Sequence, residues 1–162
     1  YLPVQDFGNA FSTFVAQNYG AGQRERICKG TRTALGLTII FSVITSGLVC
    51  LFAGPLMGIF VKTGEDAVIA AGVTYLRMEG ACYFGIGVLF LLYGYYRAIK
   101  KPGMSVVLTV ISLGTRVGLA YGTAGMIGVT GIWLAIPIGW ALADAVGLIW
   151  MKLRPLPDSM NA

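Results

Sequence analysis

The stretch TALGLTIIFSVITSGLVCLFAGPLMGIFV, residues 33–61, decides the fold because its 29 residues carry no charge. A helix needs roughly 20 apolar residues to cross the hydrocarbon core of a bilayer. Two further stretches, 80–96 and 117–143, also lack charged residues. This spacing predicts an all-α protein that crosses the membrane several times.

The composition of the chain agrees with this interpretation. Of its 162 residues, 56% are apolar and 12% are charged, and the mean hydropathy is +0.75. A soluble domain usually carries about 25% charged residues, so this chain has too few to cover a water-exposed surface. In a membrane protein a net charge of +5 reflects basic cytoplasmic loops more often than nucleic-acid binding. We therefore expect the lipid bilayer, and no nucleic acid, as a partner.

Several classes of site are excluded by the residue types that the chain lacks. Histidine is absent, and the three cysteines, Cys28, Cys50 and Cys82, form no CxxC pair. This chain therefore cannot build a zinc site, a Ser-His-Asp triad or a Cys-His nucleophile. We expect no catalytic residue, no bound metal and no cofactor.

Charge gaps and turn residues divide the chain into helices. The sequence predicts a helix tail over 1–17, a cytoplasmic loop over 18–32, and membrane helices over about 33–61, 67–96, 104–122 and 127–151. The first span is longer than a bilayer, so we expect tilt, a kink at Pro55 or protrusion. Thr63 and Asp66 resemble a capping box. Residues 122–128 are expected to form a glycine-rich hairpin, and 153–162 a disordered cytoplasmic tail.

Basic residues predict the orientation of these helices. If alternate loops lie on opposite sides, one side receives nine of the twelve basic residues and the other receives Lys62 alone. The nine are Arg24, Arg26, Lys29, Arg32, Arg97, Lys100, Lys101, Lys152 and Arg154. Cytoplasmic loops are enriched in Lys and Arg, so we expect these loops and the C-terminus to face the cytoplasm.

Small residues recur at every fourth position of the last two predicted helices. The two sets are Gly114, Gly118 and Gly122, and Ala135, Gly139, Ala143 and Gly147. Such faces let helix backbones approach each other closely in lipid. Both faces are therefore expected to pack against neighbouring helices.

Three charged residues lie inside otherwise apolar predicted helices and are the candidates for transport or ion coupling: Glu79, Arg116 and Asp144. Intramembrane charges usually face a bundle interior or an aqueous pathway. Asp144 is eight residues from Lys152, or about 12 Å along a helix, and so lies well inside. The alternatives are that Glu79 is hydrated near the outer interface and that Asp144 is a structural carboxylate.

Glu79 and Arg116 are expected to lie at similar heights on adjacent helices. Measured from the basic end, they are about 27 Å and 20 Å away along their helices, within the combined reach of two long side chains. An unpaired Arg at this depth costs on the order of 3 kcal/mol. We therefore predict that the two side chains pair; the alternative is that Arg116 extends outward to lipid headgroups.

Pro137 and Trp140 are candidates for a hinge and a cavity wall. A mid-span proline frees a backbone carbonyl, and interrupted helices mark binding sites in many transporters. A kink used for packing is an equal alternative. Trp140, one turn further on, would suit flat apolar cations, although core packing is the more common role for such a residue.

Five ordered motifs resemble those of the MATE family of multidrug exporters. The first, STFVAQNYGAG at 12–22, contains Gln17, Asn18, Gly20 and Ala21 and is similar to the motif after the eighth helix of the family. The others are YLRMEG at 75–80, YGYYRAIKKPGMS at 93–105, ISLGTRVGLAY at 111–121 and GVTGIWLAIPIGW at 128–140. They are similar to successive motifs of a bacterial branch of the family.

The resemblance implies a parent of twelve helices in two halves of six. Residues 1–152 would supply part of the C-terminal half, from the end of helix eight through helix twelve, and the N-terminal half would be its partner. The implied activity is efflux of organic cations or drugs across the bacterial inner membrane in exchange for Na⁺ or H⁺. We expect these residues not to transport alone.

The resemblance does not extend to one cation site of the family. Some members hold the coupling cation with an acid in the middle of helix ten, which corresponds to a position near Ile86. No carboxylate occurs from 80 to 96, so Glu79 is the acid left in this helix. The alternative functions are a lipid-linked oligosaccharide flippase of the same superfamily and a truncated remnant that does not transport.

Overall fold

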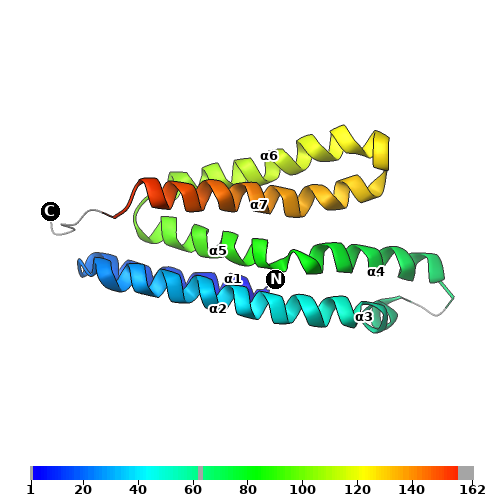
Figure 1. Cartoon of the computed structure of the whole chain (residues 1–162), viewed down its shortest axis with the longest axis horizontal. Helices are drawn as coiled ribbons and strands as arrows, with labels where there is room; N and C mark the ends of the chain where they lie inside the picture. Colours follow the sequence, from blue (N-terminus) through cyan, green and yellow to red (C-terminus); the bar gives the residue numbers. More distant parts are fainter. Residues whose placement is uncertain (1, 62–63, 157–162) are drawn as a thin grey trace.

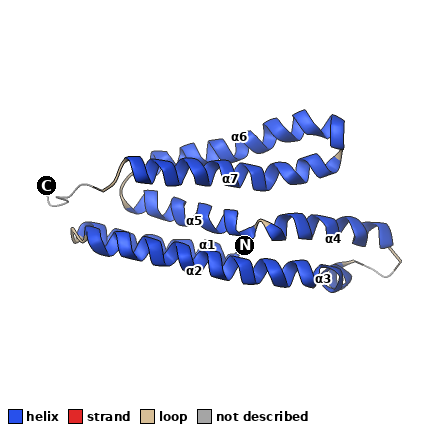
Figure 2. Ribbon diagram, in the orientation of Figure 1, coloured by secondary structure: helices blue, strands red, loops and turns tan. Residues whose placement is uncertain are grey.

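The computed structural model describes residues 2–61 and 64–156, which form helices and no strand (Figure 2). In chain order the helices are α1 (Leu2–Gly20), α2 (Arg24–Leu51), α3 (Ala53–Phe60), α4 (Asp66–Ala81), α5 (Tyr83–Ala98), α6 (Pro102–Ile127) and α7 (Val129–Leu153). The all-α prediction is confirmed.

The helices are long and apolar enough to cross a membrane. This holds for α2, α6 and α7 singly, and for α4 and α5 taken together as one span bent by 50°. Large apolar side chains on their outer faces stay exposed, among them Ile40 at 60% and Val110 at 64%. Such surfaces suit lipid rather than water, so the chain is a multi-pass membrane protein.

The long helices run along the long axis of the molecule (Figure 1). The line of α4 and α5 lies between α6 and α7 on one side and α1 and α2 on the other. Ten of the sixteen residues of α5 are buried, because this helix contacts α1, α2, α6 and α7. The core of the bundle is therefore built around α5.

The loop predicted over 18–32 is wrong, because most of it is helical. α1 continues to Gly20, and the chain turns through Gly22, whose φ is 69°. The N–H of Gln23 donates to the carbonyl of Asn18 at 2.8 Å, and that of Gly22 to the carbonyl of Tyr19 at 3.2 Å. This is the Schellman pattern, which ends a helix within a few residues, so α2 starts early at Arg24.

The predicted 33–61 helix is interrupted at Phe52, three residues before the expected kink. Pro55 has no N–H to donate, and its ring would clash with the carbonyl of Leu51, four residues back. α2 therefore ends at Leu51. Figure 1 shows α3 nearly end-on while α2 runs along the page, so the chain changes direction sharply here.

The predicted 67–96 helix is also divided, at Cys82, where α4 and α5 meet at 50°. The N–H of Cys82 donates to the carbonyl of Glu79, three residues back instead of the four of a regular helix. Gly80 and Gly85 flank this position, and glycine is among the weakest helix formers. The span is therefore broken in its interior without a proline.

Helix α6 is longer than predicted, and α7 has the predicted length but begins and ends two residues later. The hairpin expected over 122–128 is helical as far as Ile127, and the chain reverses at Gly128, which has a φ of 61°. α7 continues through Pro137 without a break and ends at Leu153.

The predicted tail is ordered where the structure describes it. Leu156 is 7% exposed and belongs to the core cluster, while residues 157–162 lie outside the described residues. Thr63 of the predicted capping box also lies outside them, and α4 begins at Asp66.

Candidate functional site

A cavity of 480 Å³ lies beside the break between α4 and α5. We call it the break cavity. Its walls come from α2, α4, α5, α6 and α7, and the residues used in the argument below are Glu79, Ile86, Phe90, Arg116, Ile136 and Trp140. It thus contains one carboxylate, one guanidinium, an indole ring and the phenol groups of Tyr75 and Tyr83 among apolar side chains.

Glu79 enters the break cavity from the last turn of α4. Its atom Oε1 is buried and has no hydrogen-bond partner in the described part of the chain. A buried carboxylate oxygen without a donor is unfavourable. Glu79 therefore has an unused capacity to bind a cation, a proton or a water molecule.

Arg116 reaches the same cavity from α6 and lies against Trp140 of α7. Its guanidinium carbon is 5.3 Å from the centre of the indole ring, which is a cation–π contact. A Cβ on Gly139 would lie 2.9 Å from Cγ of Arg116 and 2.6 Å from the carbonyl oxygen of Ser112. The absence of a side chain at Gly139 therefore allows α6 to approach closely enough for this contact.

The structure brings Glu79 and Arg116 to one cavity but does not join them in an ion pair. Within residues 2–61 and 64–156, neither Oε1 of Glu79 nor Nε of Arg116 has a hydrogen-bond partner. The partner of Arg116 is the ring of Trp140. The predicted direct pair of these two side chains is therefore not formed. Both side chains line the same cavity, and Arg116 instead makes a cation–π contact with Trp140.

The contact between Arg116 and Trp140 was not predicted from the sequence, although the spacing of the two residues indicates it. Each residue is twelve positions from Gly128, where α6 and α7 reverse direction. Residues equally far from a tight reversal lie at the same height on the two helices. An arginine that needs a partner therefore faces the tryptophan on the adjacent helix.

Asp144 is separate from the break cavity. It is 8% exposed and lies one turn beyond Trp140, where a Cβ on Gly85 would be 3.7 Å from its Oδ2. Oδ1 has no hydrogen-bond partner among the described residues. The three predicted intramembrane charges therefore do not form a single cluster, because Asp144 is packed against α5.

The remaining candidates have different surroundings. Pro137 does not line the break cavity, although its neighbour Ile136 does. The motif residues Gln17, Asn18 and Gly20 form the last turn of α1, and Ala21 follows in the turn to α2. Asn18 is 7% exposed and its Nδ2 donates to the carbonyl of Phe14 at 2.7 Å. These motif residues therefore shape a turn between helices.

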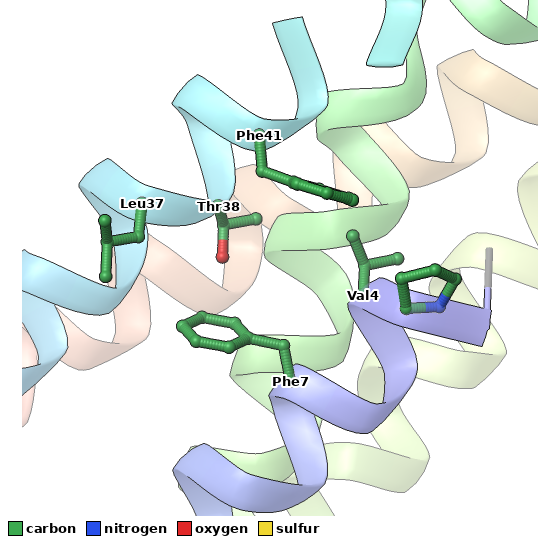
Figure 3. Close-up of a pocket in the computed structure, with 6 residues that line it drawn as sticks. Val4, Phe7, Leu37, Thr38 and Phe41 are labelled. Atoms are coloured by element: carbon green, nitrogen blue, oxygen red, sulfur yellow. The ribbon is translucent and has the colours of Figure 1, made fainter. Parts of the chain in front are cut away.

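Another cavity, of 340 Å³, lies between α1 and α2 (Figure 3). Val4 and Phe7 face Leu37 and Phe41 across it, and Thr38 supplies a hydroxyl that has no hydrogen-bond partner in the described part of the chain. No charged residue lines this cavity. It therefore offers much less to an ion than the break cavity does.

Membrane-spanning helices that bring a carboxylate and a guanidinium to one cavity are typical of helical membrane transport proteins. The model of the MatE family matches residues 1–122, and the chain belongs to this family. The membership predicted from the five motifs is confirmed.

Two relatives show how much of a transporter this chain represents. A protein of Shewanella oneidensis named "FAD transporter" is 26% identical over 139 residues, which are 85% of this chain and 30% of that protein. A solved structure described as the inward-facing conformation of a multidrug resistance MATE family transporter of the MOP superfamily matches with a TM-score of 0.86 at 20% identity. That match covers 94% of this chain and 36% of the other. The chain thus spans about a third of each relative.

Proposed function

We propose that this chain is part of an antiporter that exports small organic cations or drugs in exchange for Na⁺ or H⁺. It would act in the bacterial inner membrane, with the basic ends of its helices and the C-terminus in the cytoplasm. The observation that carries the proposal is the buried, unpartnered Oε1 of Glu79 in the break cavity. A coupling ion would supply the partner that this oxygen lacks.

Arg116 is the second part of the proposed mechanism. Its contact with Trp140 holds the guanidinium inside the cavity while leaving Glu79 unpaired. When the coupling ion leaves, the negative charge of Glu79 would attract the guanidinium, because two opposite charges interact strongly in a medium of low dielectric constant. The ion and Arg116 would then compete for one carboxylate, which links ion release to a movement of α6 against α4.

The experiment uses the full-length transporter that contains this chain, reconstituted in liposomes. Glu79→Gln keeps the size of the side chain and removes its charge. We expect substrate-driven Na⁺ or H⁺ flux to fall about tenfold or more, which corresponds to the loss of about 1.4 kcal/mol of ion binding. Normal coupled flux in this variant, at equal protein content, would remove Glu79 from the mechanism.

Asp144→Asn is the comparison that separates the two buried carboxylates. Asp144 does not line the break cavity, so we expect a smaller loss of flux than in Glu79→Gln. Loss of coupling with normal expression would instead make Asp144 the coupling group. Equal loss of folded protein and of flux would make Asp144 structural.

A second candidate substrate comes from the curated relative, whose name assigns FAD to that protein. FAD is a dinucleotide with negative charge, whereas typical multidrug substrates are organic cations. Uptake of FAD and of ethidium into inside-out vesicles containing the full-length transporter distinguishes the two. Transport of ethidium without FAD supports drug export, and transport of FAD alone supports the second candidate.

The flippase and the non-transporting remnant are the remaining alternatives. Vesicles that move neither ethidium nor FAD, but translocate a fluorescent lipid-linked oligosaccharide, would establish the flippase. The 162 residues alone are expected to give no flux in the same assay.

A further inference from the structure

A second polar cavity, of 260 Å³, lies between α1, α5 and α6 at the basic end of the bundle. We call it the basic-end pocket. Its polar lining residues come from all three helices: Gln5 and Asn9 from α1, Tyr93 and Arg97 from α5, and Ser105 and Thr109 from α6. The candidate site described above uses none of these side chains.

Arg97 gives this pocket its charge. It is the charged member of the lining, and no carboxylate lines the pocket. Its side chain is exposed, and its Nη2 donates to Oδ1 of Asn9 at 2.9 Å, which links α5 to α1. A guanidinium carries five N–H donors in a planar fork that matches the oxygens of a phosphate. Arg97 therefore has donors to spare.

The opposite wall of the pocket adds hydroxyl groups at the start of α6. Ser105 and Thr109 are one helical turn apart, and Oγ1 of Thr109 lies 3.3 Å from the hydroxyl oxygen of Tyr93. α6 begins at Pro102 with no side chain capping its first turn. Oγ of Ser105 donates to the carbonyl of Tyr93 at 3.4 Å, which ties the start of α6 to α5 at this wall.

One wall of the pocket is aromatic. The rings of Phe90 and Tyr93 meet edge to face, with their centres 6.1 Å apart. The pocket thus combines one guanidinium, hydroxyl and amide groups and an apolar wall. Basic pockets between membrane helices at this depth bind the headgroups of anionic lipids.

We propose that the basic-end pocket binds a phosphate group, carried by an anionic lipid headgroup or by a soluble organic phosphate. Arg97 bears the charge and Asn9 positions it, while the hydroxyls of Ser105 and Thr109, which already donate to backbone carbonyls, make the opposite wall polar. The exposed Lys100 and Lys101 in the following turn attract anions to the same end without lining the pocket. This inference does not depend on the proposed antiport.

Native mass spectrometry of the full-length transporter in detergent tests the proposal. Dioleoyl phosphatidylglycerol is the lipid probe, dioleoyl phosphatidylcholine the neutral control, and inorganic pyrophosphate the soluble probe. The variants are Arg97→Gln, which removes the pocket charge, and Lys101→Gln, which removes an equal charge at the same end. Lys101→Gln is thus the matched control for general electrostatic attraction.

We expect Arg97→Gln to weaken phosphatidylglycerol binding about tenfold or more, because a hydrogen bond to a charged group is lost. Lys101→Gln is expected to change it less than about twofold, as for a solvent-exposed charge. If pyrophosphate binding also depends on Arg97, the soluble organic phosphate is supported as the ligand. If pyrophosphate does not compete with phosphatidylglycerol for binding, the lipid headgroup is supported. Equal effects of the two variants on both probes would overturn the proposal.

A third variant covers the case in which Arg97→Gln does not fold. Arg97→Lys keeps the charge but loses the planar fork. We expect it to remain folded and to bind phosphatidylglycerol with an affinity between those of the unmodified protein and Arg97→Gln. The proposal would be overturned if Arg97→Lys bound phosphatidylglycerol as well as the unmodified protein does and Lys101→Gln weakened binding as much as Arg97→Gln does. Only the net charge would then matter.

Discussion

α6 and α7 carry similar stripes of small residues, but the described residues pack against only one of them. A Cβ on Gly139 or Gly147 of α7 would lie 2.6 Å from an atom of a neighbouring helix. A Cβ on Gly114, Gly118 or Gly122 of α6 would meet nothing within 4 Å in the described part of the chain. The packing predicted for both stripes is seen for α7, whereas the described residues place nothing against the α6 stripe, where packing stays a prediction.

The difference shows what spacing alone can indicate. Glycine or alanine at every fourth position creates a smooth helix face, but the pattern contains no information about what lies opposite that face. α7 contacts α4, α5 and α6 and buries seven residues, whereas the buried residues of α6 are Leu108 and Ser112. A small-residue stripe therefore predicts that close approach is allowed, and the position of the helix in the bundle decides whether it occurs.

The largest effect is expected at Gly139. Gly139→Ala places a Cβ against the Ser112 carbonyl, a backbone atom that cannot move without shifting α6. We expect a loss of about 2 kcal/mol in stability, in the range of overpacked cores, measured as a lower thermal unfolding midpoint of the full-length transporter in detergent. Gly118→Ala on the open stripe is the matched control. Equal shifts in the two variants would contradict the difference between the stripes.

A smaller loss is expected at Gly147, where the nearest atom is Cδ1 of Leu92, the end of a flexible side chain. Gly147→Ala is expected to cost about 1 kcal/mol, because Leu92 can change rotamer at a modest cost. The double variant Gly147→Ala with Leu92→Val should lose less stability than the sum of the losses in the two single variants. Strict additivity in thermal unfolding would mean that the strain lies elsewhere.

Lys100 occupies a position whose backbone conformation favours glycine, so it allows the opposite test to the glycine substitutions above. It lies two residues after the end of α5 and has a φ of 59°, and Lys101 N–H donates to the carbonyl of Tyr96 at 2.9 Å, as in the turn through Gly22. Lys100→Gly should stabilise the protein by about 0.5 kcal/mol, since relief of the left-handed conformation exceeds the added freedom of the unfolded chain. Lys100→Ala is the control for loss of charge and should not stabilise. A lower unfolding midpoint for Lys100→Gly would contradict this expectation.

No loss of stability is expected on the open stripe of α6. Gly118→Ala should leave stability unchanged or raise it by up to about 1 kcal/mol, because alanine favours a helix more than glycine does. Thermal unfolding of the full-length transporter measures this directly. A clear loss would show that another part of that protein packs against the stripe.

Hydropathy and charge positions were enough to predict the membrane helices and the intramembrane charges. The break at Phe52 follows from Pro55 once the clash with the residue four positions earlier is considered. The break at Cys82 has no such marker, because glycine weakens a helix without fixing where it bends. The basic-end pocket was not predicted, since Asn9, Arg97 and Thr109 come from three helices whose packing no local pattern specifies.

The break at Cys82 also has a consequence for the backbone field inside the membrane. The aligned peptide dipoles of a helix give its two ends partial charges of roughly half an elementary charge, negative at the C-terminus and positive at the N-terminus. In a straight helix such ends do not occur at mid-span, whereas here α4 ends and α5 begins beside the break cavity at 50° to each other. Glu79 lies in the last turn of α4, at the negative end. A cation entering the cavity would therefore meet the carboxylate beside the carbonyl end of α4, whose negative partial charge is reduced by the adjoining positive end of α5.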